Sequence, residues 1–193
     1  TTININYSHP ELEWASDSRL ILITAHRREN LGEPMHNMFR AIRRVLDEHC
    51  DVKAIYPIHM NPAVRQAAEH IFGESSPGGR EERLHLTEPL DFLDFHNFMK
   101  ASYLILTDSG GIQEEAPSLA KPVLVMRDTT ERPEGIKAGT LKLVGTDEEV
   151  IYREFTMLLD NQKEYEKMVR AVNPYGDGNA AVRIADVIEK GYC

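Results

Sequence analysis

A serine and two glycines stand where a helix is expected to follow a buried strand, in the segment Asp108-Ser109-Gly110-Gly111. Two glycines remove side chains from the start of the helix, so an anion could reach the backbone N–H groups directly. Those groups carry a partial positive charge, and the Ser109 hydroxyl could add a further donor. The chemistry that fits is the binding of a phosphate or pyrophosphate. Gly and Ser also fill many tight turns that bind nothing, so both interpretations stay open for this motif alone.

A second loop gathers positive side chains at the end of another predicted strand. The segment 24–30 contains His26, Arg27 and Arg28. Arginine binds phosphate oxygens through parallel N–H groups, and a histidine beside a phosphate can donate hydrogen bonds. The cluster therefore suits an anion, and the alternative is a solvated polar loop. His59 also follows a strand, where a capping or loop role is the simpler interpretation.

Two acidic residues, Glu114 and Glu115, are expected in the first turn of the helix after the glycines. Acidic side chains stabilise the start of a helix through its dipole, and this role explains Glu114 without a ligand. Glu115 could instead accept hydrogen bonds from the hydroxyls of a ribose, as acidic residues do in other nucleotide-binding α/β sheets.

Two further segments lie at predicted strand ends. Residues 127–135 form a long polar stretch directly after a strand, and loops this charged are either without fixed structure or functional. Leu90 precedes a segment with Phe92 and Phe95, where an aromatic ring could flank a base. For Phe92 and Phe98 the helical spacing favours packing in the core.

Apolar runs of strand length alternate with segments of helical period, which predicts an α/β fold with a parallel sheet and helices on both faces. Strands are expected at 20–24, 52–58, 83–86, 103–107, 123–126 and 141–144. Helices are expected near 35–46, 63–72 (capped by Asn61), 91–101, 111–119 (bent or shortened by Pro117), 147–159 and 164–172, and from 180 onward. Residues 73–82 are expected to form an exposed connector. In open parallel sheets ligands bind beyond the carboxyl ends of the strands, where the candidate residues lie.

Composition narrows the partners and the compartment. With 22 Lys and Arg residues against 31 Asp and Glu, the formal charge is −9, so we expect no nucleic acid partner. The apolar runs fall far short of the ~20 residues that span a bilayer, so we expect no membrane association. The eight histidines form no compact ligand set, and Cys50 and Cys193 have neither metal spacing nor a disulfide framework. We expect no metal, no cofactor and a cytoplasmic location.

Four segments together resemble the non-hydrolysing UDP-N-acetylglucosamine (UDP-GlcNAc) 2-epimerases. They are Thr24-Ala25-His26-Arg27-Arg28-Glu29-Asn30, Tyr56-Pro57-Ile58-His59-Met60-Asn61-Pro62, Asp108-Ser109-Gly110-Gly111-Ile112-Gln113-Glu114-Glu115 and Arg127-Asp128-Thr129-Thr130-Glu131-Arg132-Pro133-Glu134. The resemblance implies that residues 1–193 are one Rossmann-like domain, the carboxyl-terminal half of a two-domain, glycosyltransferase-B-like fold whose amino-terminal domain is absent. The missing initiator Met also favours an excised piece of something longer.

The resemblance also implies a role for each matched residue. His26, as the catalytic residue, and Arg132 would contact the nucleotide-sugar. The phosphates would be cradled by Ser109, Gly110 and Gly111. Glu115 would hold the ribose. Leu90 and Phe95 would line the uracil pocket. Arg27 and His59 would contact a second, activating UDP-GlcNAc. All of these roles are implied by the resemblance to the family, and none follows from spacing alone.

The family's reaction interconverts UDP-GlcNAc and UDP-N-acetylmannosamine (UDP-ManNAc) by expelling UDP and adding it back. The implied partners are UDP, a UDP-N-acetylhexosamine and the amino-terminal domain, with a homodimer for the full-length enzyme. The carboxylates that move protons are expected in the absent half, so this chain alone should bind UDP weakly and not epimerise. Ala120 and Lys137 depart from the family's usual residues. Both lie outside the four segments, and Lys137 could alter the loop after Arg132. A glycosyltransferase of the same fold and a UDP-sugar sensor without turnover are the alternatives.

Overall fold

The computed structural model describes residues 7–73 and 83–191, which form a six-stranded parallel sheet in the order β3-β2-β1-β4-β5-β6. This order starts in the middle of the sheet and adds strands outward on each side, as in dinucleotide-binding folds. The direction of addition reverses between β1 and β4, so the loops after these two strands border a crevice. The strands are β1 (Arg19–Thr24), β2 (Val52–Pro57), β3 (Leu84–Thr87), β4 (Leu104–Thr107), β5 (Val123–Val125) and β6 (Leu141–Leu143).

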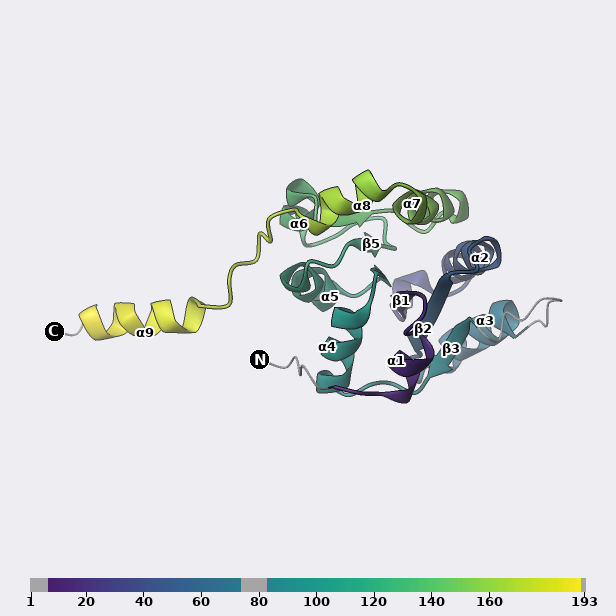
Figure 1. Cartoon of the computed structure of the whole chain (residues 1–193), viewed down its shortest axis with the longest axis horizontal. Coiled ribbons are helices and arrows are strands. Elements are labelled where there is room, and N and C mark those ends of the chain that lie inside the picture. Colours follow the sequence, from purple (N-terminus) through teal and green to yellow (C-terminus); the bar gives the residue numbers. More distant parts are fainter. Residues whose placement is uncertain (1–6, 74–82, 192–193) are drawn as a thin grey trace.

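Helices cover both faces of the sheet (Figure 1). Helices α2, α3 and α7 pack on one face, and α1, α4 and α5 pack on the other. The helices are α1 (Pro10–Trp14), η1 (Arg28–Asn30), α2 (Glu33–Glu48), α3 (Pro62–Phe72), α4 (Phe92–Ala101), α5 (Gly110–Glu115), η3 (Ala116–Leu119), α6 (Pro133–Ala138), α7 (Glu148–Asp160), α8 (Gln162–Val169) and α9 (Ala180–Gly191).

The two central strands have a nearly continuous apolar sequence because both of their faces are buried. In β1, Ile21 and Ile23 join the core beneath α2, while Leu20 and Leu22 join the core beneath α4. Successive side chains of a strand point to opposite faces, so one strand supplies both cores. This rigid centre holds the loops after β1 and β4 in fixed positions.

Most elements lie within about two residues of their predicted positions, and the corrections concern short or polar segments. Asn61 caps α3 by accepting a hydrogen bond from the Ala63 N–H, as expected. The predicted helix at 111–119 is shortened, with 3-10 geometry from Ala116 to Leu119, around Pro117. Helix α1, η1 and α6 were not predicted. In particular, residues 127–135 are not one loop, because Pro133 starts α6; proline suits this position, which needs no N–H donor.

Two further outcomes concern the periphery of the fold. Phe98 is fully buried as predicted, but Phe92 is 64% exposed, so its expected core role is wrong. Phe92 is the first residue of α4, and its ring contacts the His96 ring of the same helix rather than the core. Of the expected connector, residues 74–82 lie outside the described residues. Helix α9 extends away from the sheet (Figure 1), and across the described part of the chain no helix is long and apolar enough to cross a bilayer.

Candidate functional site

A buried carboxylate joins the two loops that border the crevice. Asp108 directly follows β4 and is fully buried. Its carboxylate accepts hydrogen bonds from the backbone N–H groups of His26 at 3.0 Å and Arg27 at 2.8 Å. It also accepts one from the Asn30 side-chain amide at 3.1 Å. The loop after β1 is therefore held against the end of β4, which brings His26 next to the Ser-Gly-Gly turn.

Two guanidinium groups converge on Gly110. A Cβ atom built on Gly110 would lie 3.4 Å from Nη2 of Arg27 and 3.8 Å from Nη2 of Arg132. Ser109 stands at the N-cap of α5 without a capping hydrogen bond from its side chain, and its N–H donates to Oγ1 of Thr107 at 2.9 Å. Because α5 has only six residues, the arginines supply most of the positive charge. The arrangement suits a multiply charged anion.

A cavity of about 670 Å³ opens beside this turn, lined by His26, Arg27, Arg28, Glu29, His59, Asn61 and Ser109. The rings of His26 and His59 are stacked, with centroids 5.3 Å apart and planes 29° apart. Both histidines are exposed. The structure thus brings together residues that the resemblance assigns to the substrate, His26 and Ser109, and residues that it assigns to the activating ligand, Arg27 and His59.

A buried arginine ties the loop after β5 to the loop after β1. Arg127 donates to both carboxylate oxygens of Glu131, at 2.7 and 2.9 Å, and its Nε donates to Glu29 at 3.1 Å. The hydrogen bonds from Arg127 lower the pKa of Glu131 to about 2. Nη1 of Arg27 lies 4.0 Å from Glu131 and Glu29. Charged contacts therefore hold the loop that leads to Arg132 against the loop after β1.

The two glutamates of the Ser-Gly-Gly motif occupy the end of α5 and not its first turn, because the helix ends at Glu115. The interpretation of Glu114 as a residue that stabilises the helix start is therefore wrong. Glu114 instead forms an ion pair with Nε of Arg132, which orients that guanidinium beside Gly110. The Glu115 carboxylate lies on the other side of the turn, and its Oε1 is 3.4 Å from a Cβ atom built on Gly111.

Leu90 and Phe95 lie apart from the 670 Å³ cavity. Both are partly buried and pack against the core beneath α4, and neither lines that cavity. They belong to the segment that leads into α4 and to its first turns, whereas His26 and His59 follow β1 and β2. Glu115 is joined to the α4 side by an ion pair with His96. The predicted residues thus form two groups on either side of the Ser-Gly-Gly turn.

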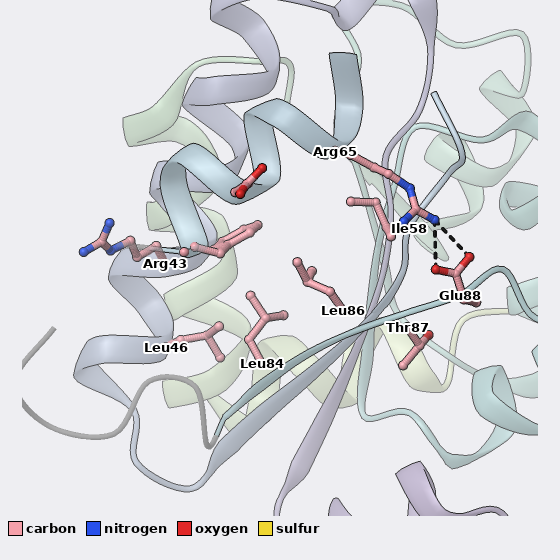
Figure 2. A pocket seen from close by; sticks show the side chains of 11 residues that line it. Arg43, Leu46, Ile58, Arg65, Leu84, Leu86, Thr87 and Glu88 are labelled. Atoms are coloured by element: carbon pink, nitrogen blue, oxygen red, sulfur yellow. Dashed lines mark hydrogen bonds and ion pairs between the residues drawn. The ribbon is translucent and has the colours of Figure 1, made fainter. Parts of the chain in front are cut away.

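A separate apolar pocket of about 540 Å³ lies between α2, α3 and the edge strand β3 (Figure 2). Figure 2 shows Leu46, Ile58, Leu84 and Leu86 around it, with an ion pair between Arg65 and Glu88 at one side. None of the residues predicted to bind a ligand lines this pocket.

Sequence reasoning missed several residues that build the site. Asp108 begins the Ser-Gly-Gly segment, and the sequence alone predicts no role for it, although a carboxylate directly after a buried strand is a usable signal. The sequence shows Arg127 and Glu131 only as members of a polar loop, and the contact of Arg127 with Glu29 spans 98 residues of sequence. His96 belongs to no metal-binding pattern, and the sequence alone predicts no role for it. Among the described residues, no group of three His, Cys, Asp or Glu side chains is arranged to hold a metal ion.

The strand order and the crevice between β1 and β4 make this a Rossmann-type domain, the class of α/β fold that binds nucleotides at this position. The sequence profile of the UDP-N-acetylglucosamine 2-epimerases matches residues 2–189. The chain belongs to the UDP-N-acetylglucosamine 2-epimerase family.

Comparisons with individual proteins agree with this membership. The UDP-N-acetylglucosamine 2-epimerase of Bacillus subtilis is 60% identical over 186 residues, covering 96% of this chain and 47% of the relative. The S. aureus MnaA–UDP co-structure superposes with a TM-score of 0.91 at 51% identity, covering 99% of this chain and 51% of that one. The Neisseria meningitidis UDP-GlcNAc 2-epimerase bound to UDP-GlcNAc gives 0.83 at 44% identity, covering 93% and 48%. The chain thus spans about half the length of these relatives.

The half-length match has a counterpart in the fold. The C-terminal domain of a group 1 glycosyl transferase (LpcC) from Francisella tularensis superposes with a TM-score of 0.63, covering 96% of this chain and 94% of that domain. At 15% identity this likeness concerns the fold alone. The predicted fold class, one half of a glycosyltransferase-B-like architecture, is confirmed.

Proposed function

We propose that this chain is the UDP-binding half of a non-hydrolysing UDP-GlcNAc 2-epimerase, which interconverts UDP-GlcNAc and UDP-ManNAc. The observation that carries the proposal is the convergence of Arg27 and Arg132 on Gly110, beside His26. The chemistry needs such a place, because UDP must leave with the electrons of the bond between sugar C1 and the phosphate oxygen. Cationic donors already in position stabilise the charge that grows on the departing diphosphate.

In this arrangement the diphosphate lies over Ser109, Gly110 and Gly111, within reach of His26 and Arg132. Gly110 is essential to the proposal because any side chain there would occupy the space between the two guanidinium groups. Glu115 accepts hydrogen bonds from the ribose hydroxyls, and Leu90 and Phe95 contact the uracil. The separation of Leu90 and Phe95 from the His26 cavity supports a ligand that extends across the turn, with its base on the α4 side.

A second UDP-GlcNAc is proposed to bind against Arg27 and His59. The cavity of about 670 Å³ supports this assignment, because Arg27 and His59 line it together with His26 and Ser109. In this proposal the sugar of the substrate and the activating ligand both occupy the space beside His26. The carboxylates that remove and return the proton at sugar C2 are assigned to the other half of the protein. The cytoplasmic location and the homodimer of the full-length protein are part of the same proposal.

Titration calorimetry of the 193-residue chain with UDP tests the nucleotide site. We expect weak but saturable binding, and we expect Glu115→Ala to weaken it by about 1–3 kcal/mol, the range for a lost hydrogen bond to a charged group. Arg132→Ala should also weaken binding. Arg153→Ala is the matched control, because Arg153 is exposed on α7 and forms an ion pair with the neighbouring Glu154. Unchanged affinity in Glu115→Ala would remove Glu115 from the ribose role.

Analysis of the sugar product separates the epimerase from the glycosyltransferase alternative. The full-length protein should convert UDP-GlcNAc to UDP-ManNAc without an acceptor, whereas a glycosyltransferase would release UDP and a glycosylated acceptor. The 193-residue chain alone should form no UDP-ManNAc, because half of the cleft and its carboxylates are missing. Formation of UDP-ManNAc by this chain would overturn the assignment of the proton-moving groups to the other half.

A further inference from the structure

His96 connects α4 to the proposed ribose-binding glutamate. Its Nε2 lies 3.4 Å from Oε2 of Glu115, in an ion pair whose side chains are 13% and 40% exposed. The other ring nitrogen, Nδ1, lies 2.8 Å from the backbone carbonyl oxygen of Phe92. The Phe92 ring lies 4.2 Å from the His96 ring, between centroids. His96 is thus largely shielded from water, with a defined partner for each nitrogen.

The contact with Glu115 joins α4 to α5 through two side chains. A carboxylate accepts hydrogen bonds and an imidazole N–H can donate one, so Nε2 of His96 is placed to attract Oε2 of Glu115.

The position of the Glu115 carboxylate gives this contact a consequence for ligand binding. Oε2 is held by His96, while Oε1 lies 3.4 Å from a Cβ atom built on Gly111 and therefore at the entrance of α5. Glu115 is the last residue of α5, where a long side chain without a partner has several accessible rotamers. Fixing one oxygen removes that freedom before a ligand arrives.

We propose that His96 is a positioning residue, which holds the Glu115 carboxylate ready for the ribose hydroxyls of UDP. The inference rests on the proposed function, because it assigns to His96 a part in the same nucleotide site. His96 does not touch the nucleotide in this arrangement. Its effect reaches the ligand only through Glu115, and this separates it from a residue that merely stabilises α4.

The test compares UDP with 2′,3′-dideoxy-UDP, which lacks the hydroxyls that Glu115 would bind. By titration calorimetry, we expect His96→Ala to weaken UDP binding by about fivefold, less than the loss of a direct charged hydrogen bond, and to leave 2′,3′-dideoxy-UDP binding unchanged. His96→Gln, which can still donate from a similar position, should retain more UDP affinity than His96→Ala. In a Glu115→Ala background, His96→Ala should have no further effect, because the group it positions is gone.

Lys100→Ala is the matched control, since Lys100 is exposed in the last turn of the same helix; it should change neither affinity. Equal losses for both nucleotides in His96→Ala and His96→Gln would overturn the inference, because a structural defect would not distinguish them. Unchanged UDP affinity in both variants would overturn it as well. If the unaltered chain does not bind UDP, the proposed function itself fails, and this inference fails with it.

Discussion

Replacing Asp108 by asparagine tests whether one buried carboxylate holds the two halves of the crevice together. The carboxylate accepts three hydrogen bonds, from the N–H groups of His26 and Arg27 and from Asn30. A hydrogen bond to a charged group contributes about 1.5–3 kcal/mol and a neutral one about 0.5–1.5, so each bond should weaken by about 1 kcal/mol. The total of about 3 kcal/mol is reduced because asparagine avoids the desolvation of a buried charge. We expect a net loss of about 2 kcal/mol.

Urea unfolding followed by circular dichroism measures this change in the free energy of unfolding. Asp108→Asn should lower the midpoint without changing the slope, because the surface exposed on unfolding is the same. Asp128→Asn is the matched control, since Asp128 is exposed on the neighbouring loop and should shift stability by less than about 0.5 kcal/mol. Equal effects of the two substitutions would refute the assigned role of Asp108. In the same variant UDP binding should weaken, because the loop that contains His26 is released.

Three further predictions concern the site and its supports. Gly135→Ala should destabilise the chain by about 1–3 kcal/mol in thermal unfolding, because the new Cβ would lie 2.4 Å from Cδ1 of Leu141. Glu131→Gln should destabilise the chain near neutral pH, and the difference in stability from the unaltered chain should shrink as the pH falls from about 4.5 towards 2. The reason is that Arg127 lowers the pKa of Glu131 in the folded chain. The carboxylate therefore stabilises the fold above its unfolded-state pKa, and this stabilisation is lost as the pH falls towards the folded-state pKa. Gly110→Ala should leave unfolding nearly unchanged, since its nearest neighbours are flexible guanidinium ends, but weaken UDP binding at least about tenfold, or ~1.4 kcal/mol.

Two of these predictions have a control in the chain. Gly191→Ala adds a methyl group with nothing within 4 Å and should not destabilise, in contrast to Gly135→Ala. Glu134→Gln removes an exposed charge of the same stretch and should show no comparable loss of stability between pH 4.5 and 7. A Gly110→Ala variant that binds UDP normally would show that the diphosphate lies elsewhere. A Glu131→Gln difference that grows in acid would contradict the role of Arg127.

The central elements of the fold could be predicted because burial leaves a direct mark on their sequence. β1 and β4 are apolar along their length since both faces are covered, and α2 repeats apolar residues at the helical period because one face packs on the sheet. The short helix α1 could not be predicted in this way. It has five residues, and it is held by tertiary contacts such as the stacking of Trp14 on His85, with ring centroids 3.6 Å apart.

The candidate site was predictable as a set of loops but not as a set of contacts. The parallel sheet alone requires the loops after β1 and β4 to share one edge, so the proximity of His26 to Ser109 followed from fold class. The ion pairs did not follow, because they depend on side-chain conformations and on which loop Arg127 or Glu114 reaches. Phe92 shows the opposite error: helical spacing predicted that Phe92 and Phe98 both pack in the core, yet Phe92, at the first position of α4, is exposed.

The most direct test of the proposed nucleotide site is a crystal structure of this chain soaked with UDP. We predict density for the diphosphate over Ser109, Gly110 and Gly111, in contact with Arg132, and the ribose hydroxyls against Glu115. Density for UDP in the apolar pocket between α2, α3 and β3, or a turn at Gly110 covered by side chains with the nucleotide elsewhere, would contradict the proposed site.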